Sequence, residues 1–261
     1  MTLIDTHTPS ATTALPVPSR SRRAVLVLVG LLNCALPTVF TLNITRMLLT
    51  GELSEHRYHQ LTGQGEILFA LWLVPIVLML RAGWRGRRPA AATGLHHLVL
   101  IGTGVVAATL APGGGAPFLV AVVTVTGALL WAALPARPRL RLPLRIDPLL
   151  APLALVGSAL LVAYAIDQLA LQDAATTGFH SSNPHFFDQA WIALTLAAMG
   201  LLAALLPAAR RSVRWVALAL VVLGGAGLAL GEGAPVHGGL LVLGAVTGLA
   251  DLAGRRSLSR N

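Results

Sequence analysis

Lysine is absent from this chain of 261 residues, and all 19 of its Lys and Arg residues are arginine. Without lysine no retinal Schiff base can form, which excludes a working microbial rhodopsin. Cys34 is the sole cysteine, which excludes an intrachain disulfide and cysteine-based metal motifs. Charged residues amount to only 11%, whereas 55% are hydrophobic and come in blocks of bilayer-spanning length. The composition therefore predicts a multi-pass membrane protein.

The apolar blocks predict an all-α integral membrane fold, a bundle of eight transmembrane helices. We place the spans near residues 24–49, 64–84, 94–111, 117–135, 148–167, 188–208, 213–230 and 235–252. Residues 1–23 are rich in Ser, Thr and Pro, so we expect a disordered cytoplasmic tail, with a second short tail at residues 255–261. The basic stretch 136–147 is expected to link a first four-helix unit, residues 24–135, to a second unit, residues 148–254.

The positions of the arginines indicate an orientation. With the N-terminus inside, 17 of the 19 arginines fall in cytoplasmic segments, and only Arg46 and Arg57 fall outside. The positive-inside rule then places both termini in the cytoplasm of a protein of the cell membrane. The net charge of +9 is therefore a topology signal, and we expect the lipid bilayer as a partner rather than nucleic acid.

Two pairs of segments indicate an internal duplication. EILFALWLVPIVLML from Glu66 resembles DQAWIALTLAAMGLL from Asp188, and in both an acidic residue opens an aromatic-bearing apolar helix. GAPFLVAVV from Gly115 likewise resembles GAPVHGGLL from Gly233. Four spans return the chain to the side on which it started. The duplication therefore predicts a 4+4 tandem repeat of two parallel halves, related by an axis along the membrane normal.

Histidines and carboxylates gather on the predicted outer side, which receives seven of the ten acidic residues and five of the eight histidines. They are Glu52, Glu55, His56, His59, Glu66, Asp167, Asp173, His180, His185, Asp188, Glu232 and His237. Imidazole with carboxylate suits zinc, iron or copper(II), so we expect His56, His59 and His185 to be ligands of a metal ion or haem. His56 and His59 would share a face if the first span continues as a helix. The alternative for His180, His185 and His237 is an ordinary interfacial role.

Depth in the membrane separates two acidic candidates. Glu66 precedes Arg81 by fifteen residues, which is roughly 22 Å of helix and shorter than the roughly 30 Å hydrocarbon core. Glu66 is therefore expected at or below the outer boundary, where a carboxylate is costly and is a functional candidate. Asp188 begins a longer apolar run and is expected at the interface. His96 and His97 fall near the opposite, cytoplasmic end, where we expect them to snorkel or to hydrogen-bond.

Four further residues are candidates for substrate binding. Arg46, with Asn43 one turn before it near the outer end of the first span, would clamp an anionic group or pair with Glu66. Tyr164 and Asp167 end the fifth span and would complete the same outer vestibule from the second unit. The alternative for Arg46 is an interfacial arginine whose side chain snorkels to water.

Two units of four helices with histidines near their outer ends resemble the haem A synthase family. Glu55, His56 and Arg57 are similar to the end of that family's Glu-x-x-His-Arg motif. The chain departs from the pattern because Glu52 lies four residues before His56, the outer cysteine pair is missing and the fourth span has no histidine. We therefore assign no family from the sequence.

Three functions fit these features. The first is a membrane-embedded enzyme or metal- or haem-binding protein that acts at the outer leaflet on a small or lipophilic substrate, with Glu66, Asp188, His59 and His185 as acid and base groups. The second is a proton-coupled transporter in which Glu66 and Asp188 carry protons. It ranks second because spans three, four and seven are almost purely apolar at mid-depth. The third is a non-catalytic assembly or immunity subunit whose outer loops bind a protein partner.

Overall fold

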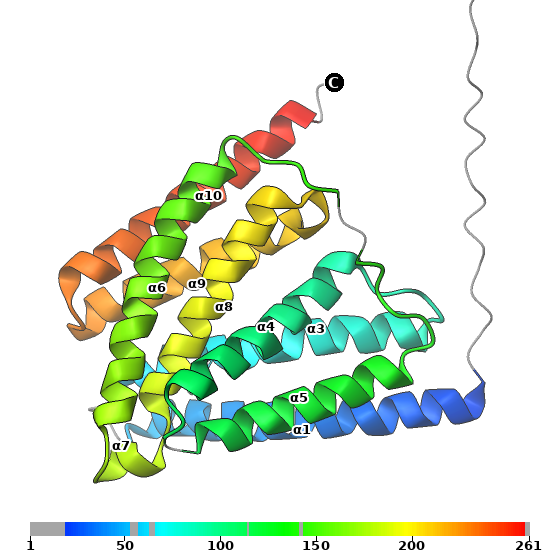
Figure 1. The fold of residues 1–261 in the computed structure, drawn as a ribbon, viewed down its shortest axis with the longest axis horizontal. Helices are drawn as coiled ribbons and strands as arrows, with labels where there is room; N and C mark the ends of the chain where they lie inside the picture. The colour runs from blue at the N-terminus through cyan, green and yellow to red at the C-terminus, as the bar shows by residue number, and fades with distance from the viewer. Residues whose placement is uncertain (1–18, 53–56, 63–65, 114, 141–142, 259–261) are drawn as a thin grey trace, which may run out of the picture.

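The computed structural model describes residues 19–52, 57–62, 66–113, 115–140 and 143–258, and every regular element in these ranges is a helix (Figure 1). Eight of the helices are long and apolar enough to cross a membrane, as predicted. They are α1 (Arg20–Thr50), α3 (Glu66–Trp84), α4 (Ala91–Leu110), α5 (Ala116–Ala133), α6 (Leu150–Ala174), α8 (His185–Leu205), α9 (Val213–Leu230) and α10 (Ala234–Leu258). The shorter α2 (Arg57–Thr62), α7 (Phe179–Ser182) and the 3₁₀ helix η2 (Pro207–Ser212) lie in connections.

The spans alternate in direction, so the bundle has two chemically different ends. At the histidine end, α1, α4, α6 and α9 finish and α3, α5, α8 and α10 begin, and α2 and α7 also lie there. The opposite, arginine end carries η2 and the basic segments between the other helix termini. In Figure 1, α1, α5, α6 and α8 come together at the lower left, which is the histidine end, and spread apart toward the arginine end.

The first span does not continue past its apolar run. Gly51 adopts a left-handed conformation, with φ 74°, and its N–H bonds to the carbonyl of Met47, which ends α1 at Thr50. The stretch from Arg57 then forms the separate helix α2. The condition under which His56 and His59 would share a face, a first span that continues as one helix, is therefore not met, and His56 lies outside the described residues.

Polar side chains tie the helices together within the apolar bundle. The Asn33 amide on α1 donates to the carbonyl of Thr126 on α5 at 2.9 Å. Between the two predicted units, the Trp191 indole on α8 donates to the carbonyl of Leu100 on α4 at 2.7 Å. A Cβ added at Gly104 would lie 2.6 Å from the Trp191 ring, so only glycine leaves room for the buried indole. Close packing and interhelical hydrogen bonds are the main sources of helix association in a bilayer.

Helices α9 and α10 approach most closely through glycine. A Cβ at Gly224 would lie 2.6 Å from the carbonyl oxygen of His237, and a Cβ at Gly244 would lie 2.8 Å from that of Ala217. The missing side chains therefore let the two backbones pack directly. This contact fixes the start of α10, and with it His237, against the rest of the histidine end.

Candidate functional site

Side chains from four helices meet in a buried polar network at the histidine end. The Tyr58 hydroxyl on α2 lies 2.9 Å from Nε2 of His237 on α10 and 3.4 Å from the Tyr164 hydroxyl on α6. Tyr164 donates to Oε1 of Gln189 on α8 at 3.4 Å, and Nε2 of Gln189 donates to the Thr62 hydroxyl at 2.5 Å. Apart from Tyr164, each of these side chains is at most 4% exposed. We call these five residues the Tyr–His network.

The hydrogen bonds of His237 define the direction of proton donation. Nδ1 lies 2.9 Å from the carbonyl oxygen of Gly233, which can only accept, so Nδ1 carries the proton. In the neutral ring Nε2 is then the acceptor, and the Tyr58 hydroxyl donates to it. The network thus pairs a hydroxyl donor with an imidazole base inside a dry, packed environment, where polar contacts are strong and leaving one unmade is costly.

A cluster of aromatic rings adjoins the Tyr–His network. The ring centroids of His59 and His185 are 5.6 Å apart, and those of His180 and His185 are 5.5 Å apart. His180 also stacks on Phe186 at 4.8 Å, and Tyr58 meets His59 edge to face at 5.6 Å. The structure therefore brings the sequence candidates His59 and His185 together. Their roles as ligands or as acid and base groups remain predictions.

The acidic candidates have different outcomes. Asp188, in the first turn of α8, is only 3% exposed. The side chain is therefore buried within the bundle, and its depth at the membrane–water interface stays a prediction. Glu66 is the first residue of α3, but its side chain, like His56, lies outside the described part of the chain. The predicted roles of Glu66 and His56 stay open.

The other predicted substrate-binding residues lie apart from the Tyr–His network, with the exception of Tyr164. The Arg46 guanidinium donates to both carboxylate oxygens of Glu52, at 2.6 and 3.0 Å. It also donates to Oδ1 of Asn43 at 3.4 Å. This guanidinium holds the pKa of the Glu52 carboxyl below its usual value by hydrogen bonding. Asn43 and Asp167 are exposed. An anion-clamping role for Arg46 remains a prediction.

Several residues of the site were not selected from the sequence. Tyr58, Thr62 and Gln189 have no motif around them, and His237 was assigned an ordinary interfacial role. The usable signal was the position of Tyr58 beside His59 in a short polar stretch. His96 and His97, expected to snorkel or hydrogen-bond, are buried near the arginine end, where His97 accepts from the Trp131 indole at 3.1 Å.

The closeness of the histidine rings does not by itself make a metal site. Within the described ranges, no group of three or more His, Cys, Asp or Glu side chains is arranged to hold a metal ion. Because His56 lies outside those ranges, this finding leaves the prediction of a His56, His59 and His185 site untested. The described geometry places a hydroxyl donor and an imidazole acceptor 2.9 Å apart at Tyr58 and His237, an arrangement that can carry acid–base chemistry.

The arginine end holds a network of ion pairs. Arg210 pairs with Asp147, and its Nε lies 3.9 Å from the carboxylate of Asp251, which is only 2% exposed. Nε of Arg214 lies 3.5 Å from the same carboxylate. Asp147 also accepts from the backbone N–H groups of Leu149 and Leu150 at the start of α6. This network connects the starts of α6 and α9 to the end of α10.

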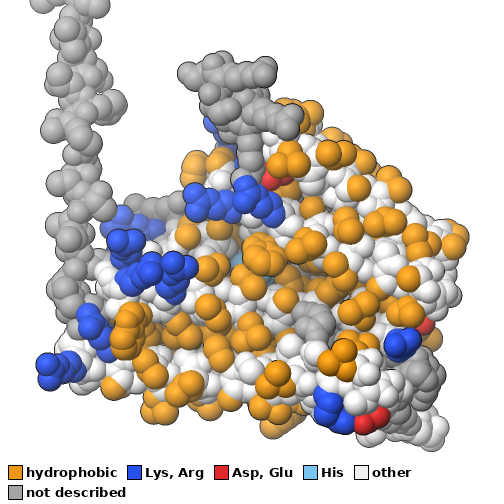
Figure 2. Space-filling model, turned by 180° about the vertical axis from the view of Figure 1, so that it is seen from behind, with side chains coloured by type: hydrophobic (Ala, Val, Ile, Leu, Met, Phe, Trp, Pro, Cys, Tyr) orange, Lys and Arg blue, Asp and Glu red, His pale blue; other side chains and the backbone are white. Residues whose placement is uncertain are grey.

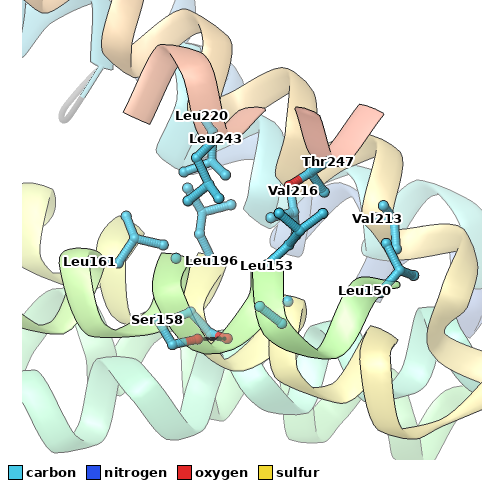
Figure 3. A pocket seen from close by; sticks show the side chains of 14 residues that line it. Leu150, Leu153, Ser158, Leu161, Leu196, Val213, Val216, Leu220, Leu243 and Thr247 are labelled. Carbon is cyan, nitrogen blue, oxygen red and sulfur yellow. Dashed lines mark hydrogen bonds between the residues drawn. The ribbon is translucent and has the colours of Figure 1, made fainter. Parts of the chain in front are cut away.

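A small cavity lies among α6, α8, α9 and α10 (Figure 3). Its volume is about 30 Å³, and its lining is mainly apolar, including Leu196, Leu220 and Leu243. Ser158 points toward it but donates to the carbonyl of Ala197 at 3.1 Å. A volume near that of one or two water-sized probes is too small for a substrate. We therefore treat it as a packing void.

Comparison with protein-family models, with curated proteins and with solved structures found no match for this chain.

Proposed function

We propose that the protein is a membrane-embedded enzyme whose acid–base site is the Tyr–His network, and that it acts on a small or lipophilic substrate at the outer leaflet of the cell membrane. The observation that carries this proposal is the 2.9 Å contact between the Tyr58 hydroxyl and His237 Nε2, buried where helices from both parts of the chain meet. Perturbable acid and base groups in a shared buried site are typical of catalytic centres.

The proposed chemistry is a proton transfer through Tyr58. A group bound at the Tyr58 oxygen gives up a proton to that oxygen, and the original hydroxyl proton passes to His237 Nε2. The bond between the substrate and its proton breaks as a new O–H bond forms on Tyr58, and the substrate keeps the electron pair. The original O–H bond breaks as an N–H bond forms on His237, and the Gly233 carbonyl stabilises the resulting imidazolium through Nδ1–H. His59, His185 and Asp188 lie at the same end and would orient the substrate or exchange the proton with the outer water.

The proposed topology follows from the arginines. Both termini lie in the cytoplasm, so the arginine end is inner and the histidine end is outer. The proposed 4+4 repeat pairs α1, α3, α4 and α5 with α6, α8, α9 and α10, linked by residues 136–147. The packing supports this pairing, because α1 contacts α3 and α5, and α6 contacts α8 and α10. The Tyr–His network then lies at the junction of the two halves.

Lipid analysis of membranes tests the enzyme proposal. Membranes from cells that express the wild-type protein, Tyr58→Phe or His237→Gln would be compared, with His97→Gln as a histidine control at the opposite end. We expect a lipid or lipophilic metabolite that changes with the wild-type and the control but with neither network variant. A cooperative thermal unfolding transition above the assay temperature would show that each variant is folded. Identical profiles for wild type and both network variants would overturn the proposal.

A spectrum of purified protein tests the cofactor version of this proposal. Visible absorption and elemental analysis for zinc, iron and copper would be measured in mild detergent. A chromophore or stoichiometric metal that is lost in His59→Ala and His185→Ala would make the histidine rings a ligand cluster. Proton-driven uptake into proteoliposomes that depends on Asp188, with no lipid product, would instead favour the transporter.

A further inference from the structure

A groove runs between α3 and α9, with α4 as its floor, from the arginine end toward the histidine end. Its wider part, about 610 Å³, lies at the arginine end, and a narrower apolar part of about 190 Å³ continues from it. The two parts share the side chains of Val74, His96, Trp215 and Leu218. They therefore form one continuous groove whose lining changes from mixed polar and apolar to almost purely apolar along its length.

Arginines stand at the polar opening of the groove. Arg211 and Arg214 both line the wider part. Arg214 is partly neutralised by Asp251, at 3.5 Å, whereas Arg211 is exposed and has no ion pair among the described residues. Figure 2 shows arginine side chains gathered along one side of a mainly hydrophobic face. The opening therefore favours an anion, and the rest of the groove favours a hydrocarbon chain.

His96 supplies a buried polar group inside the groove. Its side chain is only 6% exposed and lines both parts, at the point where polar lining gives way to apolar lining. Nε2 of its ring is buried and makes no hydrogen bond within the described residues, although the backbone of Leu71 lies near the ring. Buried polar groups are normally satisfied, and one that faces a groove indicates a ligand that completes it.

The groove follows most of the length of α3. On α3 it is lined from Leu78 to Ile67, the second residue of the helix. These eleven helical steps span roughly 16 Å. An occupant with its head at the arginines would therefore extend one chain along α3 toward the histidine end.

We propose that this groove is a specific site for an anionic phospholipid of the leaflet at the arginine end. The phosphate binds Arg211 and Arg214, His96 Nε2 shares a hydrogen bond with the region that joins the headgroup to the glycerol, and one acyl chain lies between α3 and α9. Its headgroup position lies at the end of the bundle opposite the Tyr–His network.

Lipid titration of the delipidated protein, followed by native mass spectrometry, tests the site. The probes are phosphatidylglycerol and phosphatidylcholine with the same acyl chains. We expect phosphatidylglycerol to bind at least about tenfold more tightly, and Arg211→Ala to weaken it about fivefold, from the contribution of one arginine near an anionic lipid. Arg139→Ala removes an exposed arginine that lines neither part of the groove and should leave binding unchanged.

Two further variants test the groove itself. Ala70→Trp adds a ring to the exposed wall of the apolar part and should reduce binding of both lipids. His96→Phe keeps a ring but removes Nε2, and should reduce the preference for phosphatidylglycerol over phosphatidylcholine. An unchanged thermal unfolding midpoint would show that each variant is folded.

Other outcomes would contradict the proposal. Equal binding of the two lipids, or equal effects of Arg211→Ala and Arg139→Ala, would mean that the surface attracts lipid without a specific site. Competition by inorganic phosphate as strong as that by phosphatidylglycerol would assign the arginines to a free anion. A stoichiometric protein that co-purifies with the wild type but not with Ala70→Trp would assign the groove to a protein partner.

Discussion

Gly200→Ala should stabilise the protein, because the added methyl group enters the small cavity among α6, α8, α9 and α10. Gly200 lies in α8 and lines the cavity, and a Cβ built there meets only Cγ1 of Val216, at 3.9 Å. Filling a cavity of about 30 Å³ is worth at most ~0.7 kcal/mol at ~24 cal/mol per Å³. Replacing glycine by alanine within a helix adds up to ~1 kcal/mol. The expected gain in the free energy of unfolding is therefore about 1–1.5 kcal/mol.

Gly157→Ala is the matched control. Gly157 lines the same cavity from α6, but its Cβ would lie 2.8 Å from Cδ2 of Leu243. The terminal methyl group of Leu243 must shift, which offsets part of the gain, so Gly157→Ala is expected to stabilise the protein less than Gly200→Ala. Unfolding of both variants in mixed micelles, titrated with a denaturing detergent, would measure the difference. If Gly157→Ala were as stabilising as Gly200→Ala, the packing around the cavity would be described wrongly.

Three other perturbations have defined outcomes. Tyr58→Phe and His237→Phe should each cost about 1–3 kcal/mol, and in a double-mutant cycle their coupling should be about 0.5–1.7 kcal/mol; additive effects would mean that the two side chains do not interact. Gly104→Val should displace the buried indole of α8 and cost more than about 3 kcal/mol by overpacking and loss of the interhelical hydrogen bond, and intrinsic tryptophan fluorescence would report the displacement. The ion pair of Glu52 with Arg46 contributes fully above the ordinary glutamate pKa and is lost as the pH falls through the lowered pKa of Glu52. The decrease of the unfolding midpoint at acid pH should therefore be smaller in Arg46→Ala, and an unchanged pH profile would show that the pair does not form in solution.

The sequence predicted the spans well because their signal is local. Each apolar run is long enough to cross a bilayer, and a run of that length has few alternative structures in lipid. The end of the first span was harder to predict from the sequence. The polar stretch after Gly51 has no regular spacing of apolar residues that would distinguish a continued helix from a new one. The left-handed glycine cap and the separate helix α2 decide that point.

The Tyr–His network was only partly accessible from the sequence. Its members come from residues 58, 62, 164, 189 and 237, and no sequence spacing shows that these helix ends meet. Assigning each segment to one side of the membrane by the positive-inside rule placed Tyr164 and the outer histidines at the end of the bundle where the network lies. It could not distinguish an exposed Asp167 from a buried Asp188, since that depends on which helices pack against each residue.

The most direct test of the central claim is the nitrogen NMR spectrum of His237 in protein labelled with ¹⁵N-histidine. Signals would be assigned by comparison with the His237→Gln variant. The account predicts that the proton of the neutral ring is on Nδ1 and that the Nε2 signal shifts in Tyr58→Phe, because the Tyr58 hydroxyl donates to Nε2. A proton on Nε2 in the neutral ring, or an Nε2 signal that is identical in wild type and Tyr58→Phe, would contradict it.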